Sequence, residues 1–198
     1  MHVIVDYNVG NLMSVQQAFS RVGIETVISK DPTIIAQATS LILPGVGAFS
    51  ASMNALTTSN VLHAVLTHIK ANKKTLGICL GMQMLFEASE EFGYHQGLGI
   101  FKGIIKKIPG SLKIPHMGWN SLTFTTQDPL FRYIKPNDDV YFVHSFYAQT
   151  QVGVIATTTY GQPLPAIVRL GNVYGMQFHP EKSGDTGLKL LKGYGELV

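Results

Sequence analysis

The sequence lacks the features that mark nucleic-acid-binding, secreted and membrane proteins. Only 14% of its 198 residues are charged, and the net charge is +3. No basic run is longer than a lysine pair, which argues against a nucleic-acid-binding surface. The chain has no uninterrupted run of about 18 apolar residues and does not start with a basic segment followed by an apolar one. We therefore predict a cytoplasmic protein that binds neither nucleic acid nor membrane.

Cysteine and tryptophan each occur only once. A single cysteine excludes an internal disulfide framework and is typical of a reducing compartment. With 45% hydrophobic residues the chain can bury one substantial core, so we predict a single domain over residues 1–198. We predict no metal and no cofactor.

The one cysteine, Cys79, lies between Gly77 and Gly81. Leu76 and Ile78 are typical of a buried strand, and helical spacing follows in Met82, Leu85, Phe86 and Ser89. This G-x-C-x-G spacing is the cysteine form of a nucleophile elbow, a tight strand-to-helix turn that needs glycine neighbours. The positive end of the helix would favour the thiolate. The alternative is a small buried hydrophobic residue, which the flanking glycines disfavour.

The first half of the chain alternates strands with helices. Strands are predicted at residues 3–5, 24–28 and 41–43 and before Cys79, and helices at 12–22, after Asp31-Pro32, and at 61–69 with Asn60 as the N-cap. Such alternation predicts an α/β fold, an open and mostly parallel sheet with helices on both faces.

The second half is rich in β-forming residues. Mostly antiparallel strands are predicted at residues 98–108, 121–125, 139–143, 152–159 and 166–178, with a hairpin turn at Gly171-Asn172. A closing helix is predicted from Gly184 onward. The last strand ends at His179-Pro180-Glu181, where proline fixes the backbone between two side chains that would converge.

A thiol nucleophile needs a base, and the base needs an orienting acceptor. We predict that His179 is the base for Cys79 and that Glu181 holds its imidazole. Taken alone, His179 fits a packed structural histidine equally well. The loop Pro44–Gly47 lies at the carboxyl end of a predicted parallel strand, where ligand sites collect, and its N–H groups with that of Leu80 would bind an oxyanion. The alternative for this loop is an ordinary turn.

Two of these segments resemble the signature motifs of the class I, or triad, glutamine amidotransferases: residues 77–83 and 178–181. Three stretches, residues 6–15, 116–120 and 178–183, resemble the branch of that family formed by the glutaminase subunits of imidazole glycerol phosphate synthase. The resemblance covers the whole chain. It implies a flavodoxin-like sheet, attack of Cys79 on the glutamine side-chain amide, release of ammonia, and a glutamyl thioester that water hydrolyses.

The resemblance also implies roles for further residues. Gly45, Val46 and Leu80 would form the oxyanion hole, and the glutamine would contact Gln83, Glu91 and the segment His144, Ser145 and Phe146. Without the resemblance, Glu91 reads as a solvated charge at a helix end. Two residues depart from the family pattern: Asn8 stands where glycine is frequent, and Phe146 where tyrosine is common.

A separate (β/α)₈ barrel cyclase subunit is the implied partner, which would receive the ammonia and make the oxyanion loop productive. Asn11, Trp119, Tyr141 and Lys182 match positions that face it. For Trp119 a core position is an equally good reading from sequence. Other amidotransferases or cysteine hydrolases are disfavoured by residues 6–12 and 116–120. An inactive binding module is disfavoured by the intact set Cys79, His179 and Glu181.

Overall fold

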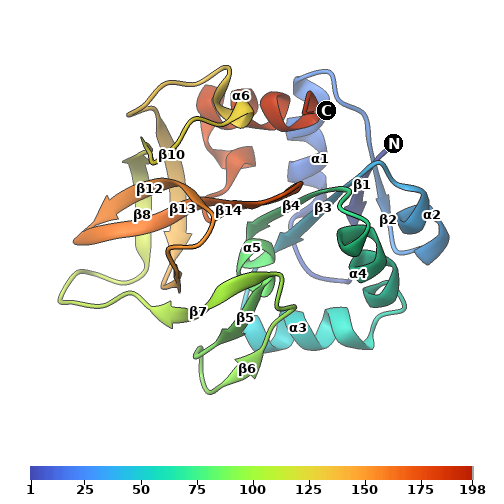
Figure 1. The fold of residues 1–198 in the computed structure, drawn as a ribbon, viewed down its shortest axis with the longest axis horizontal. Coiled ribbons are helices and arrows are strands. Elements are labelled where there is room, and N and C mark those ends of the chain that lie inside the picture. Colours follow the sequence, from blue (N-terminus) through green and yellow to red (C-terminus); the bar gives the residue numbers. More distant parts are fainter. Residues whose placement is uncertain (198) are drawn as a thin grey trace.

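The computed structural model of the chain describes residues 1–197. Its main element is an eight-stranded sheet with the order β2-β1-β3-β4-β14-β13-β12-β9 (Figure 1). The five strands from β2 to β14 are mutually parallel, and the remaining three continue the sheet in antiparallel pairing. The predicted open, mostly parallel α/β sheet with added antiparallel strands is confirmed.

The first half of the chain winds the parallel part of the sheet. Its elements are β1 (His2–Val5), α1 (Leu12–Arg21), β2 (Thr26–Ser29), α2 (Pro32–Gln37), β3 (Ser40–Gly45), α3 (Phe49–Thr58), α4 (Leu62–Lys70), β4 (Lys74–Cys79) and α5 (Leu80–Met84).

The second half adds mainly antiparallel strands and the closing helix. Its elements are β5 (Phe86–Ser89), β6 (His95–Gln96), β7 (Phe101–Lys107), β8 (His116–Ser121), β9 (Thr123–Phe124), η1 (Pro129–Phe131), β10 (Asp139–His144), β11 (Phe146–Gln149), β12 (Val154–Tyr160), β13 (Gln162–Leu170), β14 (Val173–Met176), η2 (Pro180–Lys182) and α6 (Gly184–Gly195). Two smaller sheets, β10-β8 and β11-β7-β5-β6, lie beside the main one.

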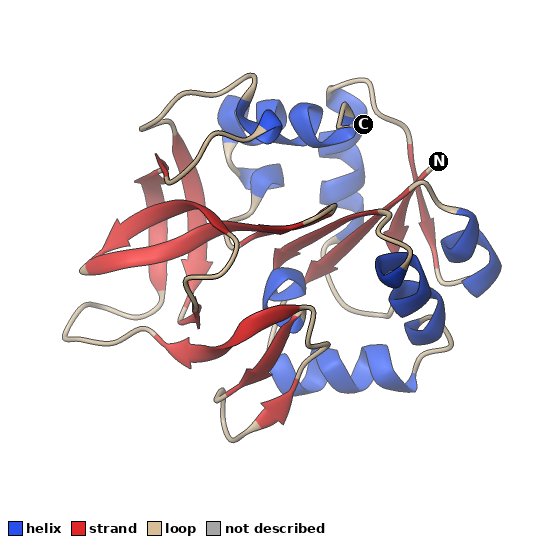
Figure 2. Ribbon diagram, in the orientation of Figure 1, coloured by secondary structure: helices blue, strands red, loops and turns tan. Residues whose placement is uncertain are grey.

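Helices cover both faces of the main sheet (Figure 2). Successive residues of a strand point to opposite faces, so Val3 and Val5 enter one core and Ile4 the other. The first core is shared with α3, α4 and α5, and the second with α1 and α6. None of the helices within residues 1–197 is both long and apolar enough to span a membrane.

Two local predictions were wrong, and one helix was missed. Phe86 and Ser89 lie in strand β5, because α5 ends after Met84 and the chain turns into the small sheet. Helix α4 is capped at Val61 without a side-chain hydrogen bond, so Asn60 is not its N-cap. Helix α3 was not predicted, since its serine- and threonine-rich sequence gives a weak helical signal.

The predicted N-cap of α2 and the predicted hairpin at Gly171 were correct. Asp31 caps α2 by accepting a hydrogen bond from the N–H of Thr33, with Pro32 at the first helical position. Strands β13 and β14 form the predicted hairpin around Gly171, whose φ is +58°. The strand predicted at residues 121–125 was only partly correct, because Ser121 ends β8 and β9 is restricted to Thr123–Phe124.

Candidate active site

Cys79 is both the last residue of β4 and the N-cap of α5, as the elbow pattern predicted. Its φ of 53° and ψ of −113° are unusual for a residue with a side chain. Such a conformation costs on the order of 1–3 kcal/mol and persists only where the surroundings enforce it. The strain turns the thiol toward the end of the sheet, and the side chain remains 8% exposed.

Close backbone packing around the elbow explains its glycines. A Cβ on Gly81 would lie 1.8 Å from the Leu43 carbonyl oxygen, and one on Gly77 would lie 2.7 Å from the backbone of Met82. A Cβ on Gly45 would lie 2.6 Å from the nitrogen of Gly81. The loop after β3 and the start of α5 are therefore in direct backbone contact.

His179 and Glu181 reach the elbow from the neighbouring strand. Strand β14 pairs in parallel with β4, placing Met176 beside Ile78, and the chain continues from there to His179. Nδ1 of His179 lies 2.8 Å from Oε1 of Glu181, and both side chains are nearly fully buried. Because Nδ1 is engaged by the carboxylate, Nε2 is the ring nitrogen left for the thiol.

The electrostatics of His179 favour its charged form. Burial alone would lower its pKa, but its interactions with Cys79 and Glu181 outweigh burial and raise the pKa to about 9. These interactions therefore favour the charged form of the His179 ring near neutral pH, and a charged ring can donate a proton to a leaving group.

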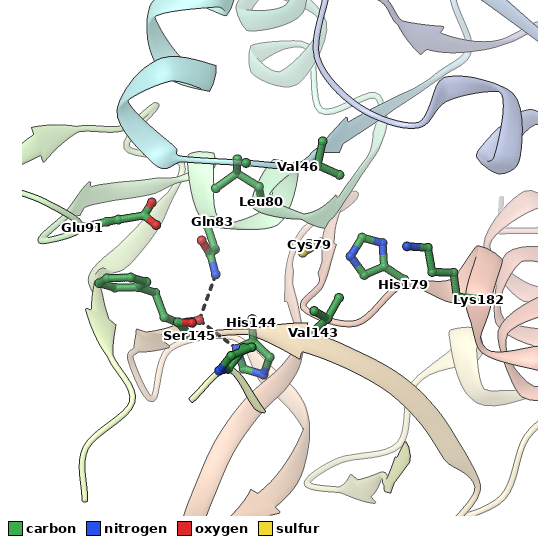
Figure 3. A pocket seen from close by; sticks show the side chains of 13 residues that line it. Val46, Cys79, Leu80, Gln83, Glu91, Val143, His144, Ser145, His179 and Lys182 are labelled. Carbon is green, nitrogen blue, oxygen red and sulfur yellow. Dashed lines mark hydrogen bonds between the residues drawn. The ribbon is translucent and has the colours of Figure 1, made fainter. Parts of the chain in front are cut away.

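A pocket of about 370 Å³ opens over the elbow (Figure 3). Cys79 and His179 line one part of it. The remaining wall contains the residues that the sequence assigned to glutamine and the oxyanion: Val46, Leu80, Gln83, Glu91, His144, Ser145 and Phe146. The structure thus brings together segments from β3, α5, β10 and β11. The volume of this pocket lies within the range of small-molecule binding sites.

Gln83 and Glu91 are each held by the backbone of another segment. Gln83 Nε2 donates to the Phe146 carbonyl at 3.0 Å and to Gln177 Oε1 at 2.9 Å. Both of its N–H groups are used, so Gln83 offers only its carbonyl oxygen to a ligand. Glu91 Oε2 accepts a hydrogen bond from the N–H of Phe49, the first residue of α3, at 2.6 Å.

The segment of Gly45 and Val46 has anchors on both sides. Tyr7 donates its hydroxyl hydrogen to the carbonyl of Pro44, and Ser52 Oγ donates to the carbonyl of Val46 at 3.3 Å. Tyr7 is buried, which raises its pKa and keeps the hydroxyl protonated. The Gly45–Val46 segment therefore lies at the end of β3, directly beside Leu80. Gly45 itself does not line the pocket over the elbow.

The four predicted partner-facing residues lie at or near the surface. Trp119 is 55% exposed, which excludes the core position, and it makes an edge-to-face contact with Tyr141 at 6.0 Å. Asn11 caps α1 by accepting from the N–H of Ser14. Lys182 is exposed and reaches the mouth of the pocket.

The structure accommodates both residues that depart from the family pattern. Asn8 has a φ of 65°, a conformation that asparagine tolerates better than most residues. Phe146 faces the pocket, but its contacts to Gln83 and to His144 use the carbonyl oxygen, which tyrosine would also supply.

Sequence reasoning missed three residues that support the site. Tyr7 anchors the loop after β3, Gln177 holds the amide of Gln83, and His116 bonds to His144 at 3.0 Å. All three lie within or directly beside stretches that resemble the family, and this position was the one signal available from the sequence. Their contacts join segments far apart in the chain, so no local pattern reveals them.

Comparison with known proteins gives consistent matches. The family model of glutamine amidotransferase class-I matches residues 3–192. The imidazole glycerol phosphate synthase subunit HisH of Lactococcus lactis subsp. lactis is 52% identical over 198 residues, covering 99% of this chain and 98% of the relative. The HisH subunit of Syntrophotalea carbinolica is 45% identical over 206 residues and covers 100% of both.

Solved structures with low sequence identity share the fold. A crystal structure of a glutamine amidotransferase matches with a TM-score of 0.75 and 20% identity, covering 98% of each chain. The glutaminase domain of Trypanosoma brucei CTPS, with bound acivicin, has a TM-score of 0.69 and 14% identity and covers 95% of that chain. The fold, the full-length relatives and the family model agree, and the chain belongs to the class I glutamine amidotransferases, in the family of HisH subunits.

Proposed function

We propose that this chain is the glutaminase subunit of imidazole glycerol phosphate synthase and that Cys79, His179 and Glu181 hydrolyse glutamine. The observation that carries the proposal is the strained elbow at Cys79, which shares one pocket with His179 while Glu181 holds the other side of the His179 ring at 2.8 Å. The family relationship supports the reaction, and the pocket geometry supports the residues.

The chemistry begins with the thiol proton on His179. The Cys79 thiolate attacks the side-chain amide carbon of glutamine, and the N–H of Leu80 with the Gly45–Val46 segment stabilises the resulting oxyanion. His179 donates its proton to the leaving nitrogen, the C–N bond breaks, and ammonia departs from a glutamyl thioester. Water then gives a proton to His179 and attacks the thioester, and breaking of the C–S bond releases glutamate and restores the thiolate.

The proposed glutamine site pairs hydrogen-bond acceptors of the protein with hydrogen-bond donors of the substrate. The carboxylate of Glu91 and the carbonyl oxygen of Gln83 suit the α-ammonium or amide hydrogens of glutamine, since both groups accept hydrogen bonds. The backbone of His144, Ser145 and Phe146 forms the facing wall of the pocket. We assign these five residues to glutamine binding.

A (β/α)₈ barrel cyclase is the proposed partner that receives the ammonia. HisH relatives are subunits of a synthase, which supports a partner chain. Asn11 and Lys182 line a small cavity beside the Gly45–Val46 segment. Exposed Trp119 contacts Tyr141, so these four residues offer an aromatic anchor and a cation for the interface. A cyclase subunit docked at these residues would lie next to the Gly45–Val46 segment and would make this oxyanion loop productive.

We further propose that residues 1–198 form one cytoplasmic domain. Strands from both halves of the chain share the main sheet, with β14 inserted beside β4. The sole cysteine is a free thiol, which suits a reducing compartment.

Two measurements test the proposal. We expect weak glutamine hydrolysis by the chain alone and a rise of orders of magnitude when the barrel subunit and its ligand are added. Strong activity that ignores the partner would contradict the coupling. We also expect a glutamine-like electrophile to label Cys79, with Cys79→Ala abolishing labelling and turnover. Mass-spectrometric labelling of another residue would refute the nucleophile assignment.

A further inference from the structure

Two buried histidines behind the glutamine pocket form a continuous hydrogen-bond chain. His144 Nδ1 lies 2.8 Å from the Phe146 carbonyl oxygen, and His144 Nε2 lies 3.0 Å from His116 Nδ1. His116 Nε2 lies 2.8 Å from Asn120 Oδ1, and Asn120 Nδ2 donates to the Thr159 carbonyl at 3.1 Å. The chain therefore runs from the pocket wall to strand β12.

Counting hydrogens along this chain gives the charge at which all of its hydrogen bonds are made. The Phe146 carbonyl can only accept, so His144 Nδ1 must carry a hydrogen. The Thr159 carbonyl can also only accept, which orients the Asn120 amide and makes its Oδ1 an acceptor for His116 Nε2. The contact between the two rings needs one more hydrogen. Three ring hydrogens on two imidazoles amount to one positive charge.

When the pair carries this extra proton, its surroundings place the charge on His116. Its ring is stacked between Tyr160, at 4.1 Å and 17°, and Phe142, at 4.9 Å and 19°, and aromatic faces attract a cation. His144 instead faces the positively charged His179. No carboxylate within residues 1–197 forms an ion pair with either ring, so Tyr160 and His179 are the titratable groups facing the pair.

We infer that His116 and His144 share one proton and act as a positioning pair for the glutamine pocket. The inference rests on the proposed glutamine site. When the proton is present, every bond from Thr159 to Phe146 is made, and the Phe146 carbonyl in turn orients the amide of Gln83. When the proton is lost, one bond in the chain is missing and the wall that carries Gln83 loosens.

The pair should lose its proton at lower pH than the triad histidine. Burial lowers the pKa of His116, and burial together with the nearby His116 and His179 lowers the pKa of His144 to about 4. The KM for glutamine should therefore rise as the pH increases through the titration of the pair, below the ordinary histidine value of about 6.5. kcat should change less, because neither ring touches the reacting atoms.

Ring-nitrogen NMR of ¹⁵N-histidine-labelled protein tests the shared proton directly. We expect both rings to titrate together in a single one-proton step on the acidic side of 6.5. Asn120→Leu removes the acceptor at one end, so a neutral pair then makes all remaining bonds, and the step should move to lower pH. Two rings that remain neutral at every pH at which the protein stays folded, or an unchanged step in Asn120→Leu, would overturn the inference.

Kinetics of His116→Phe test the positioning role. Phenylalanine fits the aromatic stack but leaves His144 without its donor. At a pH below the titration step, KM should therefore rise up to about tenfold, the value of one buried hydrogen bond, with kcat within about twofold. The matched control is His68→Phe, a buried histidine of α4 bonded to the Lys74 carbonyl. It should lose stability but keep its KM. Equal KM values in the two variants would overturn the positioning role. A wild-type protein without glutaminase activity would refute the proposed function, while the NMR step would still decide the shared proton.

Discussion

Glu91 Oε2 accepts a hydrogen bond from the N–H of Phe49, 42 residues earlier in the chain, at 2.6 Å. This carboxylate lines the proposed glutamine pocket and also caps α3, the helix that follows the Gly45–Val46 segment, through the N–H of its first residue. One side chain thus connects the proposed binding site for the substrate ammonium with the proposed oxyanion loop.

Variants of Glu91 should separate these two roles. Glu91→Gln keeps an acceptor for Phe49 but loses the charge, so KM for glutamine should rise with little change in stability. Glu91→Ala also removes the cap, which costs about 0.5–2 kcal/mol of unfolding free energy. Steady-state kinetics and chemical denaturation measure the two effects. Equal stabilities of the two variants would show that the cap contributes nothing.

Gly81→Ala should inactivate the enzyme. The new Cβ would lie 1.8 Å from the Leu43 carbonyl oxygen, so the elbow and β3 must separate. We expect a loss of roughly 3 kcal/mol or more, the upper end of overpacking, together with loss of glutaminase activity. The control Gly23→Ala has open space around its Cβ and a φ of +78°. It should cost about 1–2 kcal/mol and retain activity.

The raised pKa of His179 predicts a pH dependence of stability. Its folded pKa of about 9 lies above the ordinary 6.5, so its stabilising contribution is complete below 6.5 and is lost as the pH rises through about 9. The slope for one proton is at most about 1.4 kcal/mol per pH unit. Glu181→Gln should flatten this decline in urea denaturation, whereas Glu90→Gln, an exposed partner of Lys106, should leave it intact. A decline of the same steepness in Glu181→Gln would contradict the assignment.

Trp119→Ala should weaken partner binding without unfolding the free chain. The side chain is 55% exposed, so we expect a stability change within about 1 kcal/mol. An aromatic interface anchor is worth about 2 kcal/mol or more, which is roughly a thirtyfold rise in Kd. Calorimetric titration with the barrel subunit measures this change in Kd. Tyr94→Ala, 71% exposed and outside the proposed interface, is the control, and equal affinities of the two variants would remove Trp119 from the interface.

The sequence predicted the sheet and the elbow because their signals are local. Glycines two residues on either side of Cys79 and the alternation of strands and helices are visible in a short window. The helical spacing that includes Phe86 was misleading, since tertiary pairing of β5 with β7 overrides it. Helix α3 escaped prediction because its serine- and threonine-rich sequence gives a weak helical signal and because Glu91, which accepts its first N–H, is remote in sequence. The His116–His144 chain depends on the pairing of β8 with β10, which no single segment encodes.

The position of β14 in the main sheet has a consequence for protein synthesis. Cys79 leaves the ribosome about a hundred residues before His179, and β4 gains its β14 neighbour only after residues 173–176 have been made. A growing polypeptide therefore carries a thiol without its proton acceptor. The thiol gains this acceptor only after His179 has been made and β14 has paired with β4.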